Sequence, residues 1–228
     1  WAWGSNNRGQ LGNGGTTDAA APQRIGEGFR AVSAGNEHSV AVKTDGSLWA
    51  WGANGHGQVG NGTTTDARWP VRLGDGFVAV SAGVDNATLA LDRDGTVWSW
   101  GAPPSCPLCA PEQRQADTLR PVAVAIGFSA VATGGFTRLA LKPDGSLWAW
   151  GRQGYLGLGS SQSWPPDYVS APVQVGQGFS AIAAGRYFSE ALKSDGSLWA
   201  WGDNWAGEYG NGVAYSGYNK NLYWRYFG

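Results

Sequence analysis

The sequence predicts an all-β fold, specifically a β-propeller built from repeats about 49 residues long. Three observations carry this prediction. A Trp-x-Trp-Gly tetrad recurs at spacings of 48, 49, 50 and 51 residues, an Asp-Gly pair precedes four of the tetrads, and a segment led by Phe precedes each pair. Several landmarks that share one period indicate a repeat protein, and strand-rich repeats of roughly 40 to 50 residues are typical of propeller blades.

The tetrads mark the repeat units. They begin at positions 1, 49, 98, 148 and 199, so we expect one repeat segment over residues 1–228, with four to five blades and a partial last unit. We expect the indoles of the tetrads to be structural and packed between sheets, since burying a large aromatic side chain contributes roughly 2 to 3 kcal/mol. These indoles are Trp1, Trp3, Trp49, Trp51, Trp98, Trp100, Trp148, Trp150, Trp199 and Trp201.

Each unit is predicted to be a small antiparallel meander of three or four strands. In the second unit, residues 39–44 and 47–51 have the β-branched and aromatic composition of strands, and Asp45-Gly46 lies between them. An Asp-Gly pair supplies the positive φ angles of a two-residue type I′ turn. Further strands are expected at the segments led by Phe, which cover residues 29–35, 77–83, 128–134 and 179–185, and at residues 70–73 and 171–175.

The tetrad strand predicts how the units assemble. Side chains alternate along a strand, so Trp49 and Trp51 project to one side while Leu48 and Ala50 project to the other. Both faces are therefore apolar. A sheet without a polar face must be covered on both sides, and units that all share this property stack on one another, radially in a propeller.

Composition and charge exclude several classes of function. The formal net charge is −1 and there is no Lys/Arg run, so we expect no nucleic-acid partner. No window reaches about 18 consecutive apolar residues, so we expect no membrane span. With two His residues and no nucleophile-elbow, P-loop or metal-helix motif, we expect no enzyme, no cofactor and no metal site.

Loop motifs after the tetrads resemble a known family. The runs Gly9-Gln10-Leu11-Gly12-Asn13-Gly14 and Gly57-Gln58-Val59-Gly60-Asn61-Gly62, together with Gly35-Asn36-Glu37-His38-Ser39, are similar to the regulator of chromosome condensation repeat. That resemblance implies a propeller, commonly seven-bladed, used chiefly as a binding platform. Seven units of this length need roughly 340 residues, so we expect an arc of a longer ring. Completion of the ring by another chain is the alternative.

The chain departs from the repeat pattern in its third unit. There the Gly-Gln-Leu-Gly motif is replaced by a segment that contains Cys106 and Cys109, the two cysteines of the chain. A local disulfide is the expected state, with free thiols as the alternative, and a catalytic redox pair is disfavoured because no βαβ context surrounds it. The chain begins at Trp1 and contains no Met, so we expect a processed or partial product.

One end of the blades varies from unit to unit and is the candidate binding face. The loops after the strands led by Phe and the segments after the tetrads emerge there, and loops on a rigid scaffold commonly carry function. The competing interpretation is that their aromatic rings only cover neighbouring loops. The candidate residues are Asn36, Glu37, His38, Asp85, Asn86, Phe136, Arg138, Trp164, Tyr168, Arg186, Tyr187 and Phe188.

Taken together, these patterns predict a non-catalytic scaffold for protein–protein interaction. The partner would be another protein or further copies of this chain, and low charge with abundant Trp, Gly, Ser and Thr favours an extracellular or cell-envelope protein. Two alternatives remain open. The chain could be a structural subunit joined to others through exposed blade edges, or a carbohydrate-binding module that uses loop aromatics.

Overall fold

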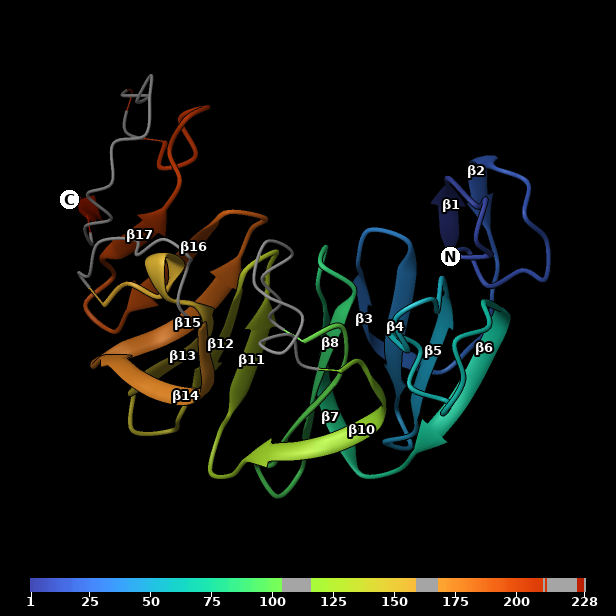
Figure 1. Ribbon diagram of the computed structural model, residues 1–228, viewed down its shortest axis with the longest axis horizontal. Helices are drawn as coiled ribbons and strands as arrows, with labels where there is room; N and C mark the ends of the chain where they lie inside the picture. Colours follow the sequence, from blue (N-terminus) through green and yellow to red (C-terminus); the bar gives the residue numbers. More distant parts are fainter. Residues whose placement is uncertain (104–115, 159–167, 211, 213–224, 228) are drawn as a thin grey trace. The chain divides into compact units, whose positions relative to one another are not determined.

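The computed structural model describes residues 1–103, 116–158, 168–210, 212 and 225–227, the last three by their backbone (Figure 1). Contacts divide the chain into two compact units. Unit 1 comprises Trp1–Pro103 and Ala116–Ile126, and unit 2 comprises Pro104–Gln115 and Gly127–Gly228. The described residues hold no helix with the length and apolarity needed to cross a membrane.

Unit 1 contains one two-stranded sheet and two four-stranded antiparallel sheets. In each four-stranded sheet the strands lie in chain order, with the strand led by Phe at one edge. The first sheet pairs β1 (Ala2–Gly4) with β2 (Ala19–Gln23). The other strands are β3 (Phe29–Ala34), β4 (His38–Lys43), β5 (Leu48–Gly52), β6 (Ala67–Gly74), β7 (Phe77–Ala82), β8 (Ala87–Asp92), β9 (Val97–Gly101) and β10 (Thr118–Ala125).

Unit 2 contains two further four-stranded sheets of the same order, so the predicted meander is confirmed with four strands per complete sheet. A short 3₁₀ helix, η2 (Gln153–Tyr155), follows the tetrad strand of the first of them. The strands are β11 (Ala130–Thr133), β12 (Thr137–Leu141), β13 (Leu147–Arg152), β14 (Tyr168–Gly176), β15 (Phe179–Ala184), β16 (Phe188–Lys193), β17 (Leu198–Gly202) and β18 (Arg225–Phe227).

The Asp-Gly turns have three residues, and the prediction of a two-residue type I′ turn was wrong. Between β4 and β5, Lys43 N donates to Ser47 O at 2.9 Å and Gly46 N donates to Lys43 O at 2.9 Å. Only Gly46 has a positive φ, of 85°. This is a turn followed by a left-handed glycine, in which Asp45 does not need a positive φ. Asp45 Oδ1 instead accepts hydrogen bonds from Ser47 N and Oγ.

The sheets of unit 1 stack face to face through their tetrad indoles. The buried Trp100 packs with Val42, Leu48 and Phe77, so the Trp-bearing face of β9 lies against the preceding sheet. Its Nε1 donates to Gln58 O at 2.8 Å in the loop that follows β5. Trp51 Nε1 does the same to Gln10 O at 2.9 Å. Each loop motif is thus completed by an indole from the next sheet.

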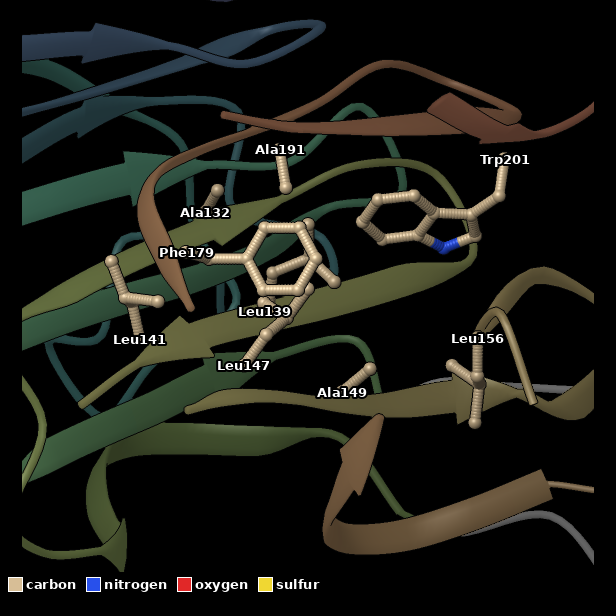
Figure 2. Close-up of a cluster of buried hydrophobic side chains, with 9 residues drawn as sticks. All are labelled: Ala132, Leu139, Leu141, Leu147, Ala149, Leu156, Phe179, Ala191 and Trp201. Carbon is tan, nitrogen blue, oxygen red and sulfur yellow. The ribbon is translucent and has the colours of Figure 1, made fainter. Parts of the chain in front are cut away.

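The sheets of unit 2 stack in the same way (Figure 2). Phe179 and the fully buried Trp201 belong to the sheet β15–β18, and they pack against leucines of the sheet β11–β14. Figure 2 shows the rings of Phe179 and Trp201 beside the aliphatic side chains of this cluster. The buried members of this cluster are Ala132, Leu139, Leu141, Leu147, Ala149, Leu156, Phe179, Ala191 and Trp201.

The two indoles of a tetrad are not equivalent. The second indole is buried in four tetrads, at Trp51, Trp100, Trp150 and Trp201. The first indole of these tetrads, at Trp49, Trp98, Trp148 and Trp199, is half-buried, and its Nε1 donates to Ser47, Asp92, Ser146 and Ser197 respectively.

Trp1 and Trp3 depart from the expected burial. They are 75% and 61% exposed. The tetrad face of each later sheet within a unit is covered by the sheet before it, and no described sheet covers this face of β1. Their exposure therefore follows from the absence of that cover among the described residues.

Candidate functional site

The candidate site is a stack of three aromatic rings on the loops of unit 2. Phe136 comes from the β11–β12 turn, Tyr187 from the β15–β16 turn, and Tyr155 from η2. The centroid of the Phe136 ring lies 5.3 Å from that of Tyr155 and 5.4 Å from that of Tyr187, with interplanar angles of 31° and 33°. We call this set, with the charged residues described next, the aromatic stack. It joins loops from two sheets.

Two arginines cover the rings. The Arg152 guanidinium carbon lies 5.2 Å from the ring centroids of both Phe136 and Tyr155, and that of Arg186 lies 5.0 Å from the Tyr187 centroid. These are cation–π distances, at which each contact contributes about 0.5 to 1 kcal/mol at exposed sites. The side chains of Phe136 and Tyr187 are partly exposed and Arg186 is exposed. Phe136 and Tyr187 therefore present ring surface beside the charge of Arg186, while Tyr155 is buried.

Glycines allow the two turns to meet. Gly135 N donates to Arg186 O at 3.1 Å, and a Cβ on Gly135 would lie 2.3 Å from that oxygen. A Cβ on Gly134 would lie 2.1 Å from Gly185 O. Any larger residue would push the turns apart, so the Gly134-Gly135 pair is the local reason that Phe136 and Tyr187 can stack.

A carboxyl with a perturbed pKa borders the stack. Burial raises the pKa of Asp203, and the neighbouring Glu208 raises it further, against opposing effects of Arg152 and of a hydrogen bond with Tyr155. Asp203 follows the tetrad of β17 directly, as Arg152 ends β13. The chemistry available here is recognition by rings and charges. Clusters of Tyr and Arg of this kind carry much of the binding energy at protein interfaces.

The structure brings together three of the candidates predicted in unit 2, namely Phe136, Arg186 and Tyr187. Arg138 is buried on β12 and is not part of the stack. The Phe188 ring packs directly against the backbone of Gly185, so closely that a Cβ on Gly185 would lie 2.3 Å from the ring. Tyr168 pairs in register with Arg152 at the start of β14 and is half-buried. Trp164 lies outside the described residues.

Sequence reasoning missed three members of the stack, Arg152, Tyr155 and Asp203. A usable signal was the residue directly after each tetrad glycine. That position holds Ser5, Ala53, Ala102, Arg152 and Asp203 in turn. Charged residues therefore stand in the fourth and fifth units where the earlier units have small ones.

The candidates of unit 1 serve mainly to build their loops. Asn36 is exposed, and Glu37 accepts a hydrogen bond from Ala53 N through its backbone oxygen. Asp85 Oδ1 accepts a hydrogen bond from Ala87 N at 3.2 Å. Asn86 has a φ of 66°, and its Oδ1 accepts a hydrogen bond from Gln58 Nε2 at 3.2 Å.

His38 is buried and neutral rather than part of an accessible face. It is 1% exposed, and its Nε2 lies 3.0 Å from Thr88 Oγ1. The Thr88 hydroxyl donates to Gln58 O, so Nε2 must be the donor to Thr88, which assigns the Nε2–H tautomer. Burial lowers the pKa of His38 to about 4.

A buried asparagine organises each loop motif, which sequence reasoning did not single out. Asn54 Oδ1 accepts from Val59 N at 2.9 Å, while its Nδ2 donates to Thr63 O at 2.9 Å and Thr65 O at 3.0 Å. Asn6 makes the corresponding contacts one unit earlier. The side chain replaces missing backbone partners inside the loop.

Two further expectations concern ligands and cysteines. Within the described part of the chain, no group of three or more His, Cys, Asp or Glu side chains is placed to hold a metal ion. The predicted disulfide between Cys106 and Cys109 lies outside the described residues.

Two family models, both described as the regulator of chromosome condensation (RCC1) repeat, match the chain. One covers residues 1–42 and 45–90, and the other covers 29–58, 77–104 and 179–210, together more than half of the 228 residues. The chain belongs to the RCC1 repeat family. No curated protein matches the RCC1-repeat chain by sequence.

Solved structures share the fold of the RCC1-repeat chain. Prp20p from Saccharomyces cerevisiae has a TM-score of 0.78 at 21% identity, over 99% of this chain and 58% of that one. Human WBSCR16 has a TM-score of 0.71 at 21% identity, over 88% and 56%. Yeast RCC1 (Prp20) bound to Kap60 has a TM-score of 0.64 at 22% identity, over 79% and 45%. The chain thus spans about half the length of these proteins, and the predicted β-propeller fold is confirmed.

Proposed function

We propose that this RCC1-repeat chain is a non-catalytic protein-binding scaffold of an exported or cell-envelope protein, and that its partner binds at the aromatic stack. The observation that carries the proposal is the tilted stacking of Tyr155, Phe136 and Tyr187, at interplanar angles of 31° and 33°, with two arginines over the rings. Rigid aromatic rings bury much area at a small entropic cost, and arginine adds directional hydrogen bonds.

The known relatives support a binding role in general terms. The structure of Prp20p is described together with its binding to Gsp1p and histones, and yeast RCC1 was solved bound to Kap60. We infer for this chain a protein partner, without assigning it any of theirs. A partner that presents hydrogen-bond acceptors suits the stack, because the exposed Arg186 guanidinium offers N–H donors to it.

The test compares variants of the stack with a matched control at the opposite end of a blade. Proteins captured from the source organism by the wild-type chain are identified, and the affinity of a purified partner is then measured by calorimetry. Tyr187→Ala with Arg186→Glu should weaken binding about tenfold to a hundredfold, as expected for residues that carry an interface. The control Arg93→Glu reverses an exposed charge at the Asp-Gly turn between β8 and β9 and should leave the affinity unchanged.

Equal weakening by the control variant, or full affinity in the double variant, would contradict the proposal. A partner that is a glycan rather than a protein would be detected by screening the wild-type chain on a glycan array. Binding there that depends on Tyr187 would favour the carbohydrate alternative.

A second function, as a subunit of a larger assembly, is favoured by a specific observation. In the sheet β3–β6, Val42 and Leu48 are fully buried under the next sheet. Their counterparts in the sheet β15–β18, Leu192 and Leu198, are 38% and 39% exposed. An uncovered blade face of this kind is a surface on which a further sheet could pack.

A further inference from the structure

Trp69 is an exposed indole that the sheet does not require. It lies on the outer strand β6, outside the tetrads, and is 64% exposed. It directly precedes a proline, and the outer strands β2, β10 and β14 contain a proline at the corresponding place. The residues before those prolines are Ala21, Arg120 and Ala171. Because small and charged residues also serve at this position, the indole is not needed to build the strand.

The Trp69 ring is held on the loop of the preceding sheet. A Cβ on Gly14 would lie 2.1 Å from Cζ2 and 2.4 Å from Cε2 of the indole, so the ring packs directly against this glycine. Gly14 N donates to Arg68 O at 2.9 Å, which ties the loop to β6 beside the ring. The rest of the ring is exposed. A ligand could stack on such a fixed aromatic surface with a small loss of conformational entropy.

Two side-chain amides adjoin this loop. Asn13 directly precedes Gly14, and its Nδ2 donates to Gln23 Oε1 at 2.6 Å. Asn13 Oδ1 accepts hydrogen bonds from Gly15 N and Asn6 Nδ2, so the orientation of this amide is fixed. The exposed Gln23, whose Oε1 is already engaged, offers the N–H donors of its Nε2 to a ligand.

Gln23 departs from the repeat pattern beside the same loop as Trp69. It pairs in register with Ala2, the residue between the two indoles of its tetrad. In the other sheets the residue at this register position is a valine, namely Val71, Val122 and Val173. An amide therefore replaces an apolar residue at the loop that supports the exposed indole. Two departures that the repeat does not need meet at one place, which indicates a binding site.

We infer that Trp69, Asn13 and Gln23 form a binding site for a neutral oligosaccharide. A pyranose ring presents C–H groups on its faces and hydroxyl groups around its rim. The indole would pack against the C–H groups, and the amides would exchange hydrogen bonds with the hydroxyl groups. Asn13 and Gln23 are uncharged, which suits an uncharged ligand. The site lies in unit 1, and the inference does not depend on the aromatic stack of unit 2.

The probes are neutral oligosaccharides, namely hexamers of β-1,4-linked glucose, N-acetylglucosamine, xylose and mannose and of β-1,3-linked glucose. Each is titrated into the full 228-residue chain. Binding is measured by calorimetry and by the NMR shift of the Trp69 indole N–H, which is assigned from its loss in Trp69→Arg. We expect saturable binding of at least one probe and a shift of the Trp69 signal with the same affinity.

The repeat supplies variants that should keep the fold. Trp69→Arg introduces the residue that already packs on Gly62 in the next sheet, so the melting temperature should stay near that of the wild type. We expect it to weaken sugar binding at least about tenfold, and Trp69→Phe, which keeps an aromatic face, to stay within about threefold of the wild type. Gln23→Val, the residue of the other sheets, should weaken binding about threefold to tenfold.

The control Tyr187→Ala alters the aromatic stack and should leave the sugar affinity unchanged. Sugar binding that survives in Trp69→Arg, or that is lost in Tyr187→Ala, would overturn the inference, and so would the absence of binding to every probe. Loss of a protein partner in Trp69→Arg without any sugar binding would make Trp69 a protein contact and would also overturn it. Trp69 and Tyr187 are substituted separately, so failure of the sugar site is distinguishable from failure of the proposed function.

Discussion

At the scale of single residues, buried polar side chains hold the loops in place. Asn54 is fully buried and is hydrogen-bonded to backbone and side-chain atoms across the loop that follows β5. An asparagine with both its oxygen and its nitrogen engaged replaces the partners that a strand or helix would supply. The loop is therefore part of the folded core rather than an appendage to it.

Replacement of this asparagine should be costly. Asn54→Ala would leave the buried Val59 N without its acceptor, at a cost of about 1 to 3 kcal/mol, and would also remove the part-buried hydrogen bonds to the carbonyl groups of Thr63 and Thr65. We expect a loss of roughly 2 to 4 kcal/mol in the free energy of unfolding, measured by urea denaturation. The control Asn36→Ala removes an exposed asparagine and should change it by less than about 0.5 kcal/mol.

His38 should make stability depend on pH. Its pKa in the folded chain, lowered by burial to about 4, lies below the value of 6.5 for an unperturbed histidine. The unfolded chain therefore binds the proton first, so the contribution of neutral His38 is complete above pH 6.5 and is lost as the pH falls from 6.5 towards 4.

Denaturant unfolding between pH 7.5 and 4.5 tests this. The slope of stability against pH should flatten in His38→Asn and persist in the control His56→Asn, whose side chain is about half exposed. A slope that is unchanged in His38→Asn would assign the pH dependence to other groups.

At the scale of elements, three of the four Asp-Gly turns, at Asp45, Asp144 and Asp195, are tied to the tetrad strand by a chain of side-chain hydrogen bonds. Trp49 Nε1 donates to Ser47 Oγ at 2.8 Å, and Ser47 Oγ donates to Asp45 Oδ1 at 2.6 Å. The hydrogen bonds from Ser47 to the carboxylate favour its charged form and lower the pKa of Asp45. The turns at Asp144 and Asp195 repeat the arrangement.

Removal of the serine hydroxyl should return the Asp45 pKa towards its ordinary value. In Ser47→Ala the side-chain hydrogen bond is lost while the backbone one remains, so we expect a partial upward shift, read from the carboxyl carbon by NMR titration. Asp144, in another turn, serves as the internal reference and should not move. An Asp45 pKa that is the same in Ser47→Ala and wild type would show that the hydroxyl does not set it.

The strands and their order were predictable, and the detailed turn geometry was not. The alternation of side chains along each strand and the repeat period of about 49 residues predict where the strands lie, because both patterns can be seen within a short stretch of sequence. The three-residue turn depends on whether Lys43 N pairs with Ser47 O, which is a question of register that the Asp-Gly pair alone leaves open. In β8, Asp92 stands in place of the lysine, and its carboxylate accepts from Trp98 Nε1 directly at 2.9 Å.

At the scale of the whole molecule, the repeat explains why the site was predicted only in part. Phe136, Arg186 and Tyr187 were found because their loops depart from the other units in sequence. Arg152 and Tyr155 contact Phe136 between loops of one sheet, and Asp203 joins them from the neighbouring sheet. A spacing along the chain does not show which loops approach each other. The sequence predicts Gly134 as the end of a strand and Gly135 as the start of the turn after it, and neither prediction indicates that two turns meet at this pair.

The uncovered faces make a prediction about association. Leu192 and Leu198 are exposed at the positions that Val42 and Leu48 occupy in the sheet β3–β6, where the next sheet buries them. Trp1 and Trp3 are exposed on the tetrad face, which in later sheets packs against leucines and valines of this kind. If these faces pair between copies, light scattering should show a mass that rises with concentration. Leu192→Lys with Leu198→Lys should hold the chain as a monomer, and Val122→Lys should not.

A monomer at all concentrations in the wild-type chain would remove the assembly function. Binding of a protein partner at the aromatic stack would be unaffected by that result, because the two predictions use different residues. The two functions can therefore be separated by experiment.

The hydrogen bonds from Trp51 to Gln10 and from Trp100 to Gln58 have a consequence for engineering. A segment that runs from one tetrad to the next contains a loop motif, but the indole that hydrogen-bonds to this loop belongs to the following segment. Libraries that shuffle, delete or multiply blades should therefore place their crossover points between the outer strand of one sheet and the aromatic start of the next, and should transplant at least two consecutive blades at a time.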